Sequence, residues 1–226
     1  MSELTVKSDA SRAEVGRVVL RCLCFTAGLL VNSFGVALIT KAALGTSPIS
    51  SIPYVLDLRF APTFGQFTFV LNMAYIAAQA ALLRRDFRPV QLLQVVANVI
   101  FSAFIDVSMG LLWWLSPQGI PAEVASLALG CAVLAFGISV EVAPNVIVVP
   151  GEGIVRAISS TLGRPFGTCK LCFDITLVLI ACGLSFAFFG GLNGLGVGTI
   201  ASALAVGPIV NAIDRRVPLI SAIRSL

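Results

Sequence analysis

Charged residues and helix-breaking residues occur together in one stretch of an otherwise apolar sequence, residues 143–174. Proline and glycine interrupt helices, and ionisable residues within membrane segments mark substrate or ion pathways. This stretch is therefore the candidate functional site. The residues that define it are Pro144, Pro150, Gly151, Glu152, Gly153, Arg156, Lys170 and Asp174.

Glu152 directly follows Pro150-Gly151, at the predicted start of a short helix. A carboxylate in a first helical turn complements the helix dipole and can cap free N–H groups. It could instead bind a substrate or a coupling ion, because Gly151 and Gly153 would let a ligand approach the backbone closely. Both interpretations stay open.

Lys170 and Asp174 are four residues apart, so they share one helix face and can form an ion pair. Asp174 lies about 10 Å beyond the predicted start of its helix, at about 1.5 Å per residue, where a carboxylate could load and release a proton. The alternative is that Lys170 lies at the membrane interface and only neutralises Asp174. Arg156 would balance charge at the site, and Glu141, which ends a predicted helix, is either a site residue or an interfacial one.

The composition places these residues in a membrane protein. Of 226 residues, 58% are hydrophobic and 12% charged, and the mean hydropathy is +0.99. About 20 residues cross the hydrocarbon layer as a helix. The sequence predicts an all-α polytopic fold with six spanning helices, at residues 17–40, 64–83, 90–115, 124–143, 167–189 and 195–213. The segments 48–60 and 150–162 are too short to span, and each begins with proline, so we expect half-helices or re-entrant elements.

The basic residues predict the topology. With the N-terminus in the cytoplasm, only Lys41 and Arg59 of the fifteen basic residues lie outside, as the positive-inside rule requires. We expect a multi-pass membrane protein with both termini cytoplasmic. Its predicted parts are a cytoplasmic tail (1–16), two membrane repeats (17–115 and 124–214), an outer loop (116–123) and a second cytoplasmic tail (215–226).

The two predicted repeats follow from the sequence itself. A shift of 102 positions lays Phe34-Gly35 on Phe136-Gly137 and Pro48 on Pro150, and a shift of 108 lays Asp106 on Asp214. Each half then has three crossings and one short Pro-started helix. Because three is odd, the second half must be inserted upside down, which is the inverted-topology arrangement of many secondary transporters. The starts of the two short helices would converge.

The predicted halves differ in charge. Neutral residues of the first half fall on charged residues of the second: Ser50 on Glu152, Tyr54 on Arg156, Thr68 on Lys170, Asn72 on Asp174 and Ile39 on Glu141. A cavity between the repeats would have a neutral wall and an ionic wall. Ser50, Ser51 and Asn72 are the candidates to hydrogen-bond a solute.

Other patterns exclude some functions. The sequence has no histidine, no Gly-x-Ser-x-Gly and no Walker lysine motif, so we expect no enzyme. Its only CxxC, Cys169 to Cys172, has no partner motif, so we expect no metal site and no cofactor. The neutral residues Asn32, Gln66, Gln79 and Asn98 are expected to bond between helices, and Gly194-x-Gly196-x-Gly198-Thr199 to form a turn with close helix packing.

The motif Phe34-Gly35-x-Ala37 followed by Ala43-Leu44-Gly45-x-Ser47-Pro48 resembles the opening of the YczE/YitT-like bacterial membrane proteins. The second half resembles the same family through Pro150-Gly151-Glu152-Gly153, Lys170-x-x-x-Asp174 and the Gly194–Thr199 motif. The resemblance covers about residues 17–214 and implies an uncharacterised inner-membrane protein without an established substrate. Family members often continue Ser-Pro with Trp-Asp, whereas Ile49-Ser50 follows Pro48 here.

These features predict a secondary transporter or facilitator of a small polar solute, with its site at the membrane midplane between the repeats. The alternative is a non-transporting accessory or regulatory membrane protein. A cavity lined by Glu152, Asp174 and Asn72 would favour transport, and a dry core would favour the accessory role. The expected partners are the lipid bilayer, a small polar solute with a coupling ion, and a second copy of the chain, but no nucleic acid.

Overall fold

The structure is a computed structural model that describes residues 2–225, with side chains from Glu14 onwards, and every regular element in that range is helical. Six of its helices are long and apolar enough to cross a membrane, which confirms the predicted all-α class. The first is longer than predicted, because it begins at Ser2. The six are α1 (Ser2–Lys41), α3 (Phe64–Leu83), α4 (Leu93–Leu111), α5 (Ile120–Val142), α7 (Phe166–Phe189) and α8 (Val197–Arg216).

The two short elements begin at the predicted prolines. Pro48–Ser50 forms one 3-10 turn, η1, that continues into α2 (Ser51–Asp57), and α6 covers Pro150–Leu162. The residues before them are extended in the same way, with φ −69° and ψ 151° at Ser47 and φ −64° and ψ 151° at Val149. Proline disfavours helical backbone in the residue before it and fits the first helical position, so each segment starts abruptly.

Three further elements connect or end the chain. The turns η2 (Arg84–Asp86) and η3 (Pro89–Leu92) join α3 to α4. Helix α9 (Pro218–Arg224) lies in the predicted C-terminal tail and was not expected as a helix. It buries Ile220 and Ile223 in a cluster with Val140 and Ala143 at the end of α5.

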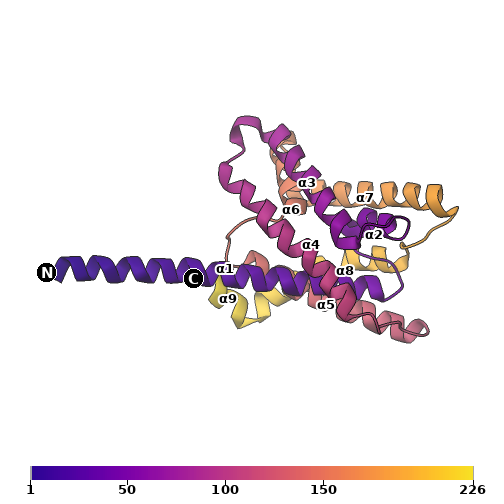
Figure 1. Cartoon of the computed structure of the whole chain (residues 1–226), viewed down its shortest axis with the longest axis horizontal. Coiled ribbons are helices and arrows are strands. Elements are labelled where there is room, and N and C mark those ends of the chain that lie inside the picture. Colours follow the sequence, from indigo (N-terminus) through magenta and orange to yellow (C-terminus); the bar gives the residue numbers. More distant parts are fainter. Residues whose placement is uncertain (1, 226) are drawn as a thin grey trace.

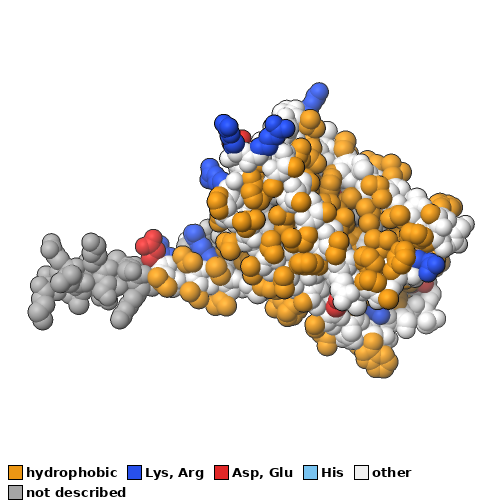
Figure 2. All heavy atoms as spheres, turned by 45° about the horizontal axis from the view of Figure 1, so that its top comes forward, with side chains coloured by type: hydrophobic (Ala, Val, Ile, Leu, Met, Phe, Trp, Pro, Cys, Tyr) orange, Lys and Arg blue, Asp and Glu red, His pale blue; other side chains and the backbone are white. Residues whose placement is uncertain are grey.

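The outer surface is apolar in the middle of the long helices. The side chains of Val70, Leu179 and Leu204 are 64%, 66% and 68% exposed, on α3, α7 and α8 respectively. Figure 2 shows hydrophobic side chains spread over the helices, with the visible basic side chains mostly near the margins. So much exposed apolar surface suits contact with lipid rather than water, as in a membrane protein.

Helices α1 and α5 form the centre of the bundle, where they cross antiparallel at four glycines. Gly28 and Gly35 of α1 lie against the backbone of Glu141 and Leu134, and Gly130 and Gly137 of α5 against that of Ile39 and Asn32. Side chains at these glycines would overlap the neighbouring helix. Small residues let two membrane helices approach to backbone contact, which is the main source of packing energy in a bilayer.

The other helices pack around this centre (Figure 1). Helix α4 packs on α1 and α8 on α5, while α3 packs on α6 and α7 on α2. Ser2 and α9 lie toward one end of the molecule, and the α4–α5 and α7–α8 connections lie toward the other. Helices α3 and α4 are in close contact, whereas α7 and α8 scarcely touch.

Buried amides join α3 to α4. The Gln79 and Gln94 side chains exchange two hydrogen bonds of 3.1 Å, and Asn72 Nδ2 donates to Asn98 Oδ1 at 2.8 Å. These bonds confirm that Gln79 and Asn98 act between helices. Gln66 does not, because its side chain accepts from the Thr63 N–H and caps its own helix.

At the start of α3, Asp106 of α4 accepts hydrogen bonds from the Thr63 hydroxyl at 2.6 Å and from the Gly65 N–H at 2.7 Å. A carboxylate at this position satisfies free N–H groups of the first helical turn and complements the helix dipole. Asp106 therefore fastens the end of α4 to the start of α3.

The glycine-rich motif before α8 packs as expected. The Gly198 N–H donates to the Leu44 carbonyl at 2.8 Å, and the Thr46 N–H donates to the Thr199 hydroxyl at 3.3 Å. Gly196 also lies against the Leu44 carbonyl, where a side chain would not fit. The motif thus ties α8 to the chain segment that leads into η1.

The glycine crossing predicts a position-specific loss of stability. Gly35→Ala would place a methyl group 2.5 Å from the Leu134 backbone, so we expect the helices to part at a cost of about 1–3 kcal/mol and the unfolding temperature to fall. Gly183→Ala on α7 meets nothing within 4 Å and should leave the temperature equal or higher. Thermal unfolding of the purified variants in detergent measures both, and equal effects would contradict the packing.

Candidate functional site

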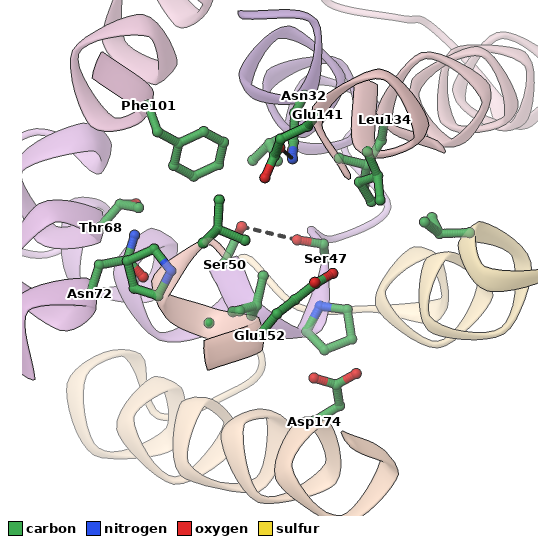
Figure 3. A pocket seen from close by; sticks show the side chains of 18 of the residues that line it. Asn32, Ser47, Ser50, Thr68, Asn72, Phe101, Leu134, Glu141, Glu152 and Asp174 are labelled. Carbon is green, nitrogen blue, oxygen red and sulfur yellow. Dashed lines mark hydrogen bonds between the residues drawn. The ribbon is translucent and has the colours of Figure 1, made fainter. Parts of the chain in front are cut away.

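A cavity of about 430 Å³ lies where the two short helices begin. The segments Ser47–Ser50 and Val149–Glu152 both line it, together with residues of α1, α3, α4, α5, α7 and α8. Gly151 lies against the Ile49 side chain so closely that a side chain there would overlap it. The starts of the two short helices therefore meet at the cavity (Figure 3).

Most of the residues predicted for the site line this cavity. They come from five elements, and they include three of the four residues that were expected to break helices there. The predicted residues in the lining are Pro48, Ser50, Asn72, Glu141, Pro150, Gly151, Glu152, Lys170 and Asp174.

Three predicted residues lie outside the lining. Arg156 is exposed and lies one helical turn beyond Glu152 on α6, outside the cavity lining. The buried Ser51 hydroxyl donates to the Pro48 carbonyl at 2.6 Å. Gly153 packs on Gln79 so closely that a methyl group at Gly153 would lie 2.5 Å from Gln79 Oε1. Ser51 and Gly153 thus stabilise the two short helices through contacts outside the cavity.

Glu141 is buried and lines the cavity. Its side chain is only 3% exposed, and Oε2 accepts a hydrogen bond of 2.7 Å from Asn32 Nδ2. Figure 3 shows both side chains at the cavity, opposite Glu152. The close approach of α1 and α5 at Gly28 brings this carboxylate and this amide together.

Lys170 and Asp174 form the predicted ion pair. Lys170 Nζ lies 2.5 Å from Asp174 Oδ1 and 2.7 Å from Oδ2. The two side chains are 32% and 19% exposed, and both line the cavity. The predicted pairing is confirmed, and both residues lie at the cavity.

Glu152 is half-buried and points into the cavity between Glu141 and Asp174 (Figure 3). Helix α6 begins at Pro150 without a side-chain cap, and the structure gives Glu152 no hydrogen-bond partner among the described residues. Its charge complements the helix dipole, but its oxygens stay available to a ligand.

Neutral polar residues line the cavity beyond those predicted. Ser47 donates to Ser50 at 2.9 Å, and Asn98 reaches the cavity beside Asn72. The sequence signal for these residues was weak, because Ser and Asn are common at helix interfaces. The lining residues that had not been proposed as ligands include Asn32, Ser47, Thr68, Asn98, Phe101, Ser202 and Asn211.

Within the described chain, no group of three or more Cys, Asp or Glu side chains is placed to hold a metal ion. Cys169 is buried and Cys172 exposed, so the two thiols of the CxxC face different surroundings.

The family of unknown function DUF6198 matches residues 19–215, which include every residue that lines the cavity. The chain belongs to this family. No curated protein and no solved structure matches the chain. Membership in DUF6198 therefore brings no activity with it, and the function of this chain has to be argued from the cavity.

The meeting of the two short helices predicts a cross-link in this DUF6198 protein. In a cysteine-free background, Ile49→Cys with Gly151→Cys should form a disulfide under mild oxidation, because the two positions are in contact. Ile49→Cys with Ser160→Cys is the matched control, since Ser160 lies near the other end of α6 and is exposed. Mobility on non-reducing gels after cleavage between the halves measures the bond. Equal yields from both pairs would contradict the arrangement.

Proposed function

We propose that the protein is a secondary transporter or facilitator for a small polar solute, which binds in the cavity between the two halves. One observation carries the proposal: the starts of both short helices and three carboxylates face one cavity. Interrupted helices that meet at a polar site are the usual construction of secondary transporter sites. A volume of about 430 Å³ is in the range of small-molecule sites.

The contacts of α1 with α5 support an inverted repeat. Under the shift of 102 positions, the contact of Gly28 with Glu141 becomes that of Gly130 with Ile39, and both occur. The contact of Gly35 with Leu134 likewise becomes that of Gly137 with Asn32. Because α1 and α5 run antiparallel, a two-fold axis that relates the halves would pass through this crossing and invert one half against the other.

The two halves differ in one packing, and this difference supports alternating access. Helices α3 and α4 are in contact, but their counterparts α7 and α8 scarcely touch. In the first half Asp106 bonds Thr63 and Gly65 at the start of α3. Its counterpart Asp214 instead accepts from Arg224 of α9 at 2.9 Å and makes no hydrogen bond to α7 among the described residues.

The side chains explain why α3 and α4 are in contact while α7 and α8 scarcely touch. The shifts lay the Asn72–Asn98 pair on Asp174 and Val206, and a carboxylate cannot hydrogen-bond a valine. They lay the Gln79–Gln94 pair on Ala181 and Ser202, which are too short to bridge two helices. The second half therefore lacks the hydrogen bonds between side-chain amides that hold α3 against α4 in the first half.

These differences indicate to which side of the membrane the cavity opens in the proposed transport cycle. Under the predicted topology, α7 begins and α8 ends at the cytoplasm, so the gap between them opens the cavity to that side. If α3 instead separated from α4 and α7 packed on α8, the cavity would open to the outside. Ligands move such equilibria when they bind one state better than the other.

The resemblance to YczE/YitT-like proteins and the location in the bacterial inner membrane belong to the same proposal. The accessory role remains its rival, and a cavity lined by Glu152, Asp174 and Asn72 supports transport over it. A sealed, fully paired core would have supported the rival.

Transport itself is tested in liposomes with labelled amines, amino acids and carboxylates under an imposed proton or sodium gradient. We expect gradient-driven uptake of at least one solute, and a fall of roughly tenfold or more with Glu152→Gln and with Asp174→Asn, since each removes a charge from the site. Glu123→Gln, which changes a carboxylate outside the cavity, should retain uptake. Full gradient-coupled uptake by both site variants would refute their coupling role, and no uptake of any solute would favour the accessory function.

Alternating access is tested by fastening α3 to α4. Thr63→Cys with Asp106→Cys, joined by a short reducible cross-linker, would hold the contact that already exists between these side chains. We expect uptake to stop on cross-linking and to return on reduction, because the outer ends of α3 and α4 could no longer separate. Each single cysteine variant, treated alike, is the control. Undiminished uptake by the cross-linked protein would show that the two helices do not part.

A further inference from the structure

The donor groups of the cavity are largely occupied by bonds within the protein. Lys170 donates to both oxygens of Asp174, Asn32 donates to Glu141, and Asn72 donates to Asn98. The hydroxyls that line the cavity behave in the same way, because most of them donate to carbonyl oxygens of their own helices or to another hydroxyl. These bonds involve Ser47, Thr68 and Ser202.

The groups left over are mainly acceptors, although the Asn211 amide and the Ser50 hydroxyl also donate no hydrogen bond among the described residues. Glu141 is nine-tenths buried, and only its Oε2 is bonded, so Oε1 has no partner among the described residues. Both oxygens of Glu152 and Oδ1 of Asn72 are likewise without a donor in that part of the chain. An ionised carboxylate can only accept hydrogen bonds, so these oxygens would accept them from the N–H or O–H groups of a ligand.

The charges of the cavity favour a positively charged ligand. Among the described residues that line the cavity, Glu141, Glu152 and Asp174 face a single cation, Lys170, which is already paired with Asp174. An anion would meet two carboxylates without a paired cation and would be repelled. A cation would instead balance Glu141 and Glu152, and charge-assisted hydrogen bonds to carboxylates are about twice as strong as neutral ones.

The starts of the two short segments, η1 and α6, would favour an anion, and η1 has no acidic residue in its first turn. The start of α6 differs in this respect. Its first N–H groups carry a partial positive charge of about one half. Glu152 lies in that same first turn and brings a full negative charge, so the turn as a whole is negative. The start of α6 therefore does not reverse the preference of the cavity.

The remaining lining is apolar. Phe101, Leu134 and Ile138 face the carboxylates, and Val206 and Val210 of α8 continue the surface. Figure 3 shows the Phe101 ring and Leu134 on the side of Glu141. A ligand with a short hydrocarbon portion would cover this surface, and the face of Phe101 would attract a cation.

We propose that the cavity takes a small organic ammonium ion, with its N–H groups directed at Glu141 Oε1 and Glu152 and its hydrocarbon portion against the apolar lining. The proposal rests on the proposed function in that it assigns the solute of the same site. Its N–H donors distinguish it from a quaternary ammonium ion, and its charge from a carboxylate of the same size.

Binding is measured with the purified full-length protein in detergent by calorimetry and thermal unfolding. The probes are n-butylammonium, n-butyrate and tetramethylammonium at equal concentrations. We expect n-butylammonium to bind and raise the unfolding temperature, tetramethylammonium to bind at least tenfold more weakly because it has no N–H donor, and n-butyrate to have no effect. Tighter binding of n-butyrate, or no response to n-butylammonium, would overturn the proposal.

Two variants locate the ammonium group. Glu141→Gln and Glu152→Gln keep the side-chain shapes and should each weaken n-butylammonium about tenfold or more, whereas Glu123→Gln outside the cavity should not. If Glu141→Gln fails to fold, the half-buried Glu152→Gln alone decides the matter. Wild-type affinity in that variant would refute the assigned contact.

Binding and transport can fail separately. Binding of n-butylammonium without uptake by liposomes would support the assigned ligand class and refute transport. Gradient-driven uptake of carboxylates, but not of n-butylammonium, would support transport and refute the ammonium ligand.

Discussion

The antiparallel contact of α1 with α5 is the interaction on which the rest of the molecule depends. Four glycines bring the two backbones together, and α4 and α8 then pack on its two sides. The same contact places Asn32 beside Glu141, because the two residues lie next to the glycines of the opposite helix. A bilayer provides no hydrophobic force between helices, so such close packing has to hold the centre of the bundle. One wall of the cavity is therefore part of the most tightly packed contact in the structure.

The polar groups are distributed unequally around this centre. In the first half, buried amides satisfy one another and join α3 to α4. In the second half, the corresponding positions hold Asp174, Ala181, Ser202 and Val206, which form no such bridge. An amide pair is well satisfied away from water, whereas a carboxylate needs a cation, a proton or water. The charged residue Asp174 thus lies on α7, which scarcely touches α8.

The short helices combine two roles in the site. Their prolines start them abruptly, and Gly151 lets the starts approach to contact with Ile49. Supporting residues behind them, Ser51 and Gly153, are buried and bonded or packed. The cavity is thus bounded by the first turns of two segments that are too short to form spanning helices. Glu152 lies in the first turn of α6. This geometry, with acceptors left free and donors occupied, is the physical basis for the proposed ammonium ligand.

The sequence by itself determined the elements and the ionic half of the site. Hydropathy and length located all six long helices, and Pro48 and Pro150 marked the starts of the two short ones, because proline acts locally on its own backbone. The Lys170–Asp174 pair was predictable because its members are four residues apart on one helix. Among the described elements, the turn η2 and helix α9 were missed, because segments of three and seven residues are too short to be recognised by periodicity.

Only the tertiary structure decided which side chains meet across the bundle. Asn32 and Glu141 are 109 residues apart, and no local pattern relates them. Arg156 lies one turn beyond Glu152 on the same face of α6, yet it is exposed and outside the cavity, because the extent of the cavity depends on which helices cover each turn of α6. The separation of α7 from α8 likewise depends on the balance of contacts over whole helices, which a linear sequence does not reveal.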